Sequence, residues 1–249
     1  MTKEGRQTPL GQRPHAPYLS AMNETLLTAL ALIPALVFAI VFHEVSHGWT
    51  ALALGDPTAK ERRRLSLNPI RHVDPIGTLV VPGALALVGA PVFGWAKPVP
   101  VNKWRLNNPR FGMMAVAAAG PGSNLLLAGI GAILLGLLAR GLSAPPEGAL
   151  GFAVMSLNYF ILITIFLALF NLLPIPPFDG SHIVEGLLPA PAAEVYNKLR
   201  PFGFPLVFLL LLVLPSLIPG FDIVERFVLP PVEWAQHQYY RLAELIAGG

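Results

Sequence analysis

The sequence contains no cysteine and few charged residues, and both absences narrow what the protein can be. Without cysteine there are no disulfides, no thiolate zinc ligands and no thiol nucleophile, so a metal ion would have to be bound by histidine, aspartate or glutamate. Only 12% of the 249 residues are charged and 54% are hydrophobic, whereas soluble proteins have about 25% charged residues. This composition predicts a polytopic membrane protein with no room for a sizeable soluble domain. The first 20 residues lack an early apolar core, so we expect no cleavable signal peptide.

The basic residues are concentrated in two short stretches. Residues 60–64 and 97–110 together hold eight of the 17 lysines and arginines. Under the positive-inside rule, such stretches are cytoplasmic loops of a membrane protein. We therefore expect the lipid bilayer as a partner, a cytoplasmic position for both stretches, and no binding of nucleic acid.

Long apolar runs predict an all-α polytopic membrane protein with about four to five transmembrane helices and a re-entrant β-hairpin-like segment. Residues 1–20 are expected to be a disordered polar tail, 21–220 the membrane core, and 221–249 a C-terminal interfacial segment. The four clearest helices are expected from Glu24, capped by Asn23, to about Leu54, and over Phe111–Leu138, Phe152–Leu173 and Phe202–Leu217.

The region between the first two of these helices has one apolar stretch, which is too short and too interrupted to cross the membrane. Residues 59–78 are polar and suggest a short strand and loop. Leu79–Val92 is apolar but contains Pro82 and Gly83, and its length suits a segment that enters the membrane and returns. Residues 93–102 contain prolines that favour extended backbone. Together, residues 79–101 predict a re-entrant β-hairpin.

The sequence His43-Glu44-Val45-Ser46-His47 follows a run, Leu26–Phe42, that has no charged side chain. Two histidines four residues apart share one face of a helix, so both can bind the same metal ion. Glu44 would lie beside that ion, where it could take a proton from water. Each ionisable group costs about 2.5–3.5 kcal/mol at the centre of a membrane helix. This cost favours a catalytic zinc site over a chance match.

A catalytic zinc ion needs a third protein ligand. The candidate carboxylates outside the motif are Asp56, Asp74, Asp179 and Glu185. Asp179 is preferred because it ends a proline-rich break after a span, and irregular backbone at membrane depth is tolerated where it lines a wet or protein-filled site. Helix capping is the alternative role for Asp179. His182, one turn further on, is a candidate to contact the ligands or to replace one.

Five ordered motifs resemble those of the site-2 proteases, a family of intramembrane zinc metalloproteases. They are HEVSH (43–47), NPIRHVDPIGT (68–78), GWAKPVPVN (94–102), AAAGPGSN (117–124) and NLLPIPPFDG (171–180). With GWAKPVPVN, the chain resembles the compact bacterial branch without PDZ or CBS domains. It departs from the family pattern at Phe178, where leucine is usual, and this exchange of one apolar residue for another leaves Asp179 in place.

The resemblance implies an enzyme that cleaves a transmembrane segment of membrane-protein substrates, in regulated intramembrane proteolysis. It implies a bacterial cell membrane location with the active site toward the cytoplasm. One zinc ion per chain would be bound by His43, His47 and Asp179, with Glu44 activating water. Asn124 and Asn171 would contact the substrate backbone or stabilise the oxyanion. Residues 95–102 would offer an extended edge to an unwound substrate.

Two alternatives use the same histidine pair. A metal transporter would need further histidine or acidic residues along the other spans, and the sequence offers almost none. A catalytically silent zinc-binding scaffold would not need the full set of reactive residues, all of which are present. Measured zinc content and turnover separate these alternatives from a protease.

Overall fold

Helices account for all the regular secondary structure in the computed structural model, which describes residues 17–87, 89, 94–142, 144–218, 220 and 222–248. No strand occurs in these residues. The all-α class is therefore confirmed. The α-helices are α1 (Pro17–Ala53), α2 (Thr58–Glu61), α3 (Val81–Leu87), α4 (Pro109–Ala139), α5 (Gly148–Asn171), α6 (Asp179–Leu187), α7 (Ala190–Asn197), α8 (Gly203–Phe208), α9 (Leu214–Leu217) and α10 (Leu229–Ala247).

Four helical stretches are long and apolar enough to cross a membrane, as the sequence predicts. They are Glu24–Ala53 within α1, all of α4, all of α5, and Ala190–Leu217, which joins α7, α8 and α9. The last stretch begins at Ala190 instead of Phe202. Helix α1 begins at Pro17, so the cap predicted at Asn23 is wrong and residues 17–20 belong to the helix. The rest of the expected tail, residues 1–16, lies outside the described residues.

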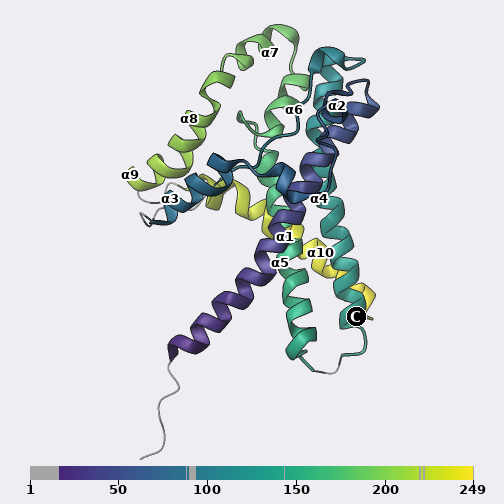
Figure 1. The fold of residues 1–249 in the computed structure, drawn as a ribbon, viewed down its shortest axis with the longest axis vertical. Coiled ribbons are helices and arrows are strands. Elements are labelled where there is room, and N and C mark those ends of the chain that lie inside the picture. The colour runs from purple at the N-terminus through teal and green to yellow at the C-terminus, as the bar shows by residue number, and fades with distance from the viewer. Residues whose placement is uncertain are drawn as a thin grey trace, which may run out of the picture.

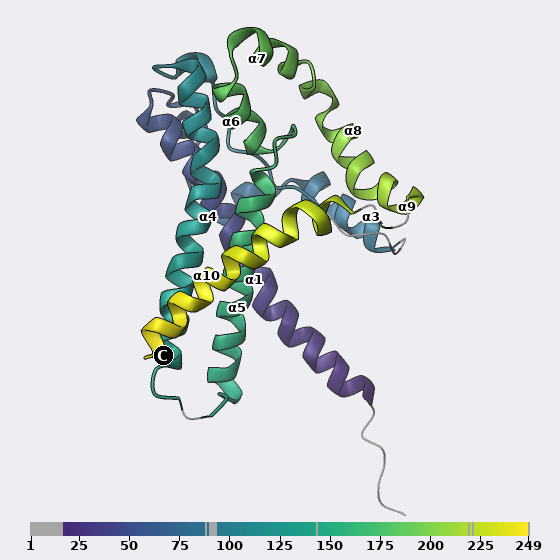
Figure 2. The same ribbon diagram turned by 180° about the vertical axis from the view of Figure 1, so that it is seen from behind.

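Helix α4 is the centre of the bundle and packs against α1, α5, α6 and α10 (Figures 1 and 2). Its glycines permit this close packing. A Cβ on Gly131 would lie 3.0 Å from Cγ1 of Ile161 on α5, and one on Gly136 would lie 2.5 Å from the carbonyl oxygen of Ala243 on α10. Because apolar side chains gain little by leaving lipid for protein, small residues that let backbones approach are a main source of helix association in membranes.

Helix α10 crosses α4 and α5 at an oblique angle, on the side that faces the viewer in Figure 2. A cluster of buried apolar side chains joins the three helices, and its best-buried members are Ala128, Ala132, Ile161, Ile165, Val228 and Val232. The hydroxyl of Tyr239 also donates a hydrogen bond to the carbonyl oxygen of Leu125 at 2.9 Å. This packing fixes the C-terminal helix on the bundle. Its predicted position at the membrane interface stays a prediction.

The region predicted as a re-entrant β-hairpin returns to its starting point, but its first part, residues 79–87, is helical, and residues 94–101 form no strand. The amide of Trp95 donates to the carbonyl oxygen of Gly77 at 3.1 Å, and that of Lys97 to the carbonyl oxygen of His72 at 2.9 Å. Between these ends lie a π-helical turn, Pro75–Val80, and α3. The β-hairpin is therefore not confirmed. Residues in the helical turns form hydrogen bonds within their own helix, so they need no partner strand. The tip of the predicted hairpin at residues 88 and 90–93 lies outside the described residues.

The two basic stretches lie at the same end of the bundle. Nη2 of Arg64 donates a hydrogen bond to the carbonyl oxygen of Lys97 at 2.8 Å. Arg105 forms an ion pair with Glu61 on α2, with 2.7 Å between Nη1 and Oε2. The strand predicted within residues 59–78 is absent, because local hydrogen bonds close α2 and a 3₁₀ turn at Pro69–His72 instead.

Candidate metal centre

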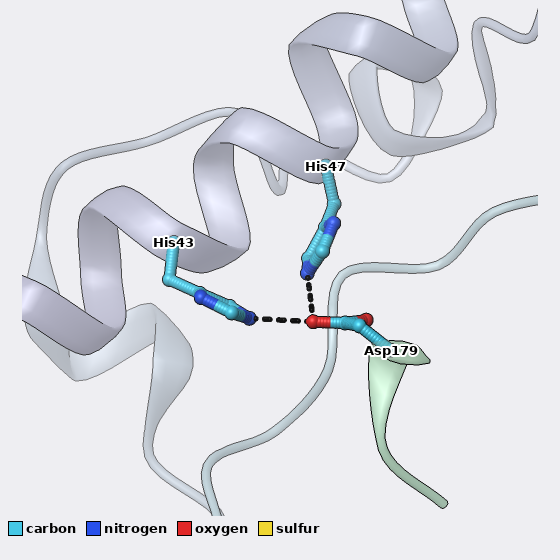
Figure 3. Close-up of side chains that lie close together, drawn as sticks. All are labelled: His43, His47 and Asp179. Atoms are coloured by element: carbon cyan, nitrogen blue, oxygen red, sulfur yellow. Dashed lines mark ion pairs between the residues drawn. The ribbon is translucent and has the colours of Figure 1, made fainter. Parts of the chain in front are cut away.

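His43 and His47 lie one helical turn apart on the buried side of α1. Their residues are only 7% and 8% exposed, and their ring centroids are 4.6 Å apart with the ring planes nearly perpendicular. Both Nε2 atoms point away from α1 toward the same carboxylate (Figure 3). The spacing of four residues therefore does what the sequence predicts: it aims two imidazole nitrogens at one point.

Asp179 is the first residue of α6, directly after the proline-rich break that ends α5. Its neighbour Gly180 lies against the backbone carbonyls of Leu172 and Leu173, where a side chain would not fit. The chain therefore folds back tightly after α5, and α6 packs against α4. This turn carries the carboxylate to the histidines on α1.

Three ligand atoms converge in this way. Oδ2 of Asp179 lies 3.0 Å from Nε2 of His43 and 3.3 Å from Nε2 of His47. This oxygen is buried and receives no hydrogen bond from any residue in the described part of the chain. Zinc bonds of about 2.0–2.2 Å place two ligands of a tetrahedral ion roughly 3.3 Å apart. The donor set and the spacing thus fit a zinc ion with an open fourth position.

Gly120 of α4 leaves the space that such an ion needs. A Cβ at this position would lie 2.5 Å from Nε2 of His47 and 2.6 Å from Nε2 of His43. Glycine is the residue whose missing side chain keeps both nitrogens accessible. The sequence analysis assigned no role to Gly120, although it lies within the small-residue motif at 117–124.

Both imidazoles are also held from behind by α4. Nδ1 of His47 lies 2.7 Å from the carbonyl oxygen of Val116, so it donates to that oxygen and leaves Nε2 free to bind metal. Nδ1 of His43 lies 3.3 Å from the side-chain amide nitrogen of Asn124, which is completely buried. Positions 116, 120 and 124 are four residues apart and therefore share one face of α4.

Glu44 lies on α1 between the histidines and faces the extended segment at residues 94–102. Its Oε2 accepts a hydrogen bond from the amide of Val99 at 2.7 Å, while Oε1 makes no hydrogen bond within the described residues. Gly48 lets this segment approach, because a Cβ there would lie 2.9 Å from Cγ1 of Val99. The amide of Val99 thus fixes Oε2 of Glu44 and leaves Oε1 free to accept a proton.

Two other predicted site residues make contacts outside the convergent group. Asn171 ends α5, where its Nδ2 donates to the carbonyl oxygen of Leu167 at 2.9 Å. His182 faces Arg200, with 2.9 Å between Nδ1 and Nη2. Burial and the nearby charge of Arg200 lower the pKa of His182 to about 4, so the ring is neutral at neutral pH. His182 is not among the three convergent ligand atoms.

The remaining candidate carboxylates have other partners. Asp74 caps the turn that follows it by accepting from the amides of Ile76 and Gly77. Glu185 forms an ion pair with Arg200. Asp56 is completely buried and accepts from the amide of Asn102 at 2.6 Å. These carboxylates are occupied by structural contacts, which leaves Asp179 as the one that reaches the histidines.

Two histidines and an aspartate that fit zinc, next to a glutamate and enclosed by helices able to cross a membrane, define a membrane-embedded metalloprotease. Comparison with known proteins gives the family: the profile described as "Peptidase family M50" matches residues 142–214, which include Asp179. The chain is 40% identical over 199 residues to "Putative zinc metalloprotease YwhC" of Bacillus subtilis (strain 168), covering 78% of this chain and 87% of that protein. This protein therefore belongs to peptidase family M50, the site-2 protease family.

Two mycobacterial relatives carry the same kind of name. "Putative zinc metalloprotease Rip2" of Mycobacterium tuberculosis (strain ATCC 25618 / H37Rv) is 32% identical over 196 residues, covering 76% of this chain and 68% of that protein. The protein of the same name from Mycolicibacterium smegmatis (strain ATCC 700084 / mc(2)155) is 28% identical over 188 residues, with the same two coverages. No solved structure gives a significant match. Family membership thus rests on sequence, and the site geometry adds independent support.

Proposed function

We propose that this protein cleaves a transmembrane segment of membrane-protein substrates, in regulated intramembrane proteolysis at a bacterial cell membrane. The observation that carries the proposal is that His43, His47 and Asp179 each direct one ligand atom to the same point, with the three atoms within 4.8 Å of one another. Glu44 lies next to His43 on the same helix. In a membrane, such a cluster of ionisable groups is expensive and marks a functional site. One zinc ion per chain would be bound there, with the active site toward the cytoplasm.

The reacting groups follow from the geometry of α1. A zinc ion bound by the three ligands would supply Lewis-acid polarisation of the scissile carbonyl and of a water molecule. Oε1 of Glu44 takes the proton from that water and later delivers it to the leaving amine. The hydrogen bond from Val99 to Oε2 orients the carboxylate, so the same oxygen serves in both transfers.

The extended segment at residues 94–102 is suited to hold the substrate. The amides of Lys97 and Val99 and the carbonyl oxygen of Lys97 are bonded to the protein. In an extended chain the intervening groups point to the opposite edge. The carbonyl oxygens on that edge, at residues 96, 98 and 100, accept no hydrogen bond from described residues. An unwound substrate strand would donate its amides to them.

Such pairing also explains how a transmembrane helix could become accessible to cleavage. The carbonyl groups of a transmembrane helix are already hydrogen-bonded within the helix. Local unwinding exposes the scissile carbonyl, and pairing with the edge at residues 96–100 replaces the lost bonds. Asn171, the last residue of α5, is also proposed to contact the substrate backbone.

The test compares wild type with Glu44→Gln. Both proteins are purified in detergent, their zinc content is measured, and each is incubated with a model transmembrane substrate. We expect equal zinc in both and cleavage by wild type alone, because glutamine retains the shape of glutamate but cannot accept the proton. Equal cleavage by both proteins would contradict the role of Glu44. Stoichiometric zinc with no turnover in wild type would favour a zinc-binding scaffold.

A further inference from the structure

Asn124 is completely buried behind His43, yet only one of its two side-chain polar atoms has a partner. Its Nδ2 lies 3.3 Å from Nδ1 of His43. Its Oδ1 is buried and has no hydrogen-bond partner among the described residues. A buried amide oxygen without a hydrogen-bond partner is unfavourable and rare in folded proteins, so the arrangement calls for an explanation.

The protonation of His43 explains the orientation that the Asn124 amide must adopt when zinc binds. A neutral imidazole that binds metal through Nε2 carries its proton on Nδ1, and Nδ1 is then a donor. An amide nitrogen is also a donor, so the pair as it stands would place two donors face to face. Rotation of the Asn124 amide by a half turn exchanges Oδ1 and Nδ2 in place. The oxygen then accepts from Nδ1 of His43, and the clash between two donors disappears. Nδ2 takes the buried place of Oδ1, where no described residue bonds to it.

The second histidine shows the same arrangement with a backbone partner. Nδ1 of His47 donates to the carbonyl oxygen of Val116, eight residues before Asn124 on the same face of α4. Helix α4 would thus provide an acceptor for each imidazole, one from its backbone and one from a side chain. Both acceptors leave Nε2 without a proton and directed at Asp179.

We propose that Asn124 is a positioning residue whose side-chain carbonyl oxygen accepts a hydrogen bond from Nδ1 of His43 and thereby increases the affinity of the centre for zinc. The proposal rests on the zinc site of the proposed function, and it gives Asn124 a role that does not involve the substrate. It differs from the role implied by family resemblance, in which the amide donates to a substrate carbonyl.

The test is zinc affinity, measured on purified zinc-free protein by competition with a chromophoric chelator, so that no turnover is needed. Asn124→Leu removes the acceptor at similar volume, and we expect zinc to bind about 10–100-fold more weakly, as when such supporting contacts are lost elsewhere. Asn124→Asp retains an acceptor and removes the amide donor, and we expect affinity within about threefold of wild type. Asn158→Leu is the matched control and should bind zinc like wild type, because this half-buried asparagine donates to the carbonyl oxygen of Val154 on its own helix, α5.

Three results would overturn the inference. Wild-type zinc affinity in Asn124→Leu, with or without loss of cleavage, would show that Asn124 does not support His43. Equal weakening in Asn124→Leu and Asn124→Asp would show that an acceptor is not what matters. Absence of zinc binding in wild type would overturn both this inference and the proposed function, whereas the first two results would leave the protease assignment intact.

Discussion

Gly120 on α4 faces His47 on α1 so closely that a Cβ on the glycine would lie 2.5 Å from Nε2 of the histidine. Real Cβ atoms do not approach other atoms so closely, so this position tolerates no side chain while the imidazole stays in place. The same Cβ would lie 2.6 Å from Nε2 of His43. A single glycine on the central helix thus keeps open the space in front of both nitrogens.

Gly120→Ala should therefore abolish zinc binding without preventing folding. The methyl group would fill the space in front of both Nε2 atoms and push the rings apart, while alanine is a better helix former than glycine. Zinc content of the purified protein, with circular dichroism as a check of helicity, measures the outcome. Gly122→Ala is the matched control, because a Cβ there meets no atom within 4 Å. Full zinc occupancy in Gly120→Ala would show that the metal does not lie against α4.

Asp179→Ala should also lose zinc, whereas Asp74→Ala should retain it. Asp179 supplies the only carboxylate oxygen close to both histidines in the described part of the chain, and two imidazoles alone bind zinc far more weakly than three ligands. Asp74 only caps a turn. Atomic absorption measures the zinc content of both purified variants. Loss of zinc in Asp74→Ala but not in Asp179→Ala would mean that the third ligand has been assigned to the wrong residue.

The three residues that converge at the candidate metal centre were predictable from sequence because each has a local signal. His43 and His47 follow from helical periodicity, and Asp179 follows from a polar residue placed at a break in an apolar run. The predicted span boundaries of α4 and α5 also agree with the structure to within a few residues. Long apolar helices have strong signals because hydrocarbon permits few alternatives.

The supporting contacts had no such signal. The hydrogen bond from Val99 to Glu44 spans 55 residues and that from His47 to Val116 spans 69, and both use backbone groups that every residue possesses. The β-hairpin is not confirmed for a related reason: prolines in residues 98–100 favour extended backbone but do not indicate whether a partner strand exists. Gly120 could have been suspected from its motif, but its function depends on how α1 and α4 pack.

Gly48→Ala should reduce cleavage while leaving zinc in place. A Cβ at this position would lie 2.5 Å from Cδ2 of Leu65 and 2.9 Å from Cγ1 of Val99. Both side chains would have to shift, and we expect the short valine side chain to take the segment at residues 94–102 with it, away from α1. The hydrogen bond that orients Glu44 would lengthen, and we expect a fall in kcat of about 10–100-fold, within the range for general-base catalysis.

Zinc content and cleavage kinetics of Gly48→Ala are measured beside Gly83→Ala, the control, because a Cβ on Gly83 meets no atom within 4 Å. Gly83→Ala should match wild type in both measurements. Unchanged kcat in Gly48→Ala would indicate that the segment does not orient Glu44 during turnover.

Asp56→Asn should destabilise the protein at neutral pH and less so in acid. Burial alone would raise the pKa of Asp56, but hydrogen bonds from Thr58 and from the amide of Asn102 hold the pKa below its ordinary value. A carboxyl group whose pKa is lowered by folding stabilises the fold above its unfolded pKa, near 4, and loses this contribution as pH falls through the folded value. Removing hydrogen bonds to the charged group should cost about 1–3 kcal/mol at pH 7.

Thermal unfolding of zinc-free wild type and Asp56→Asn in detergent, from pH 7 down to pH 3, checks this prediction. Zinc-free protein is used so that release of zinc in acid does not enter the comparison. The difference between the two melting temperatures should be largest at neutral pH and shrink below about pH 4. A difference that stays constant over this range would mean that the charge on Asp56 does not contribute.

Gly136→Ala should loosen the C-terminal helix from the bundle. A Cβ on Gly136 would lie 2.5 Å from the carbonyl oxygen of Ala243 and 2.8 Å from Cβ of Ile246, and neither α10 group can rotate out of the way. Overpacking of this kind costs about 1–3 kcal/mol, and we expect a lower melting temperature in detergent together with faster proteolysis near the C-terminus. Gly129→Ala, on the same helix, is the control because its Cβ would lie at an ordinary 3.5 Å from Cε1 of Tyr239. If both variants melt like wild type, then α10 is not held against α4 at Gly136.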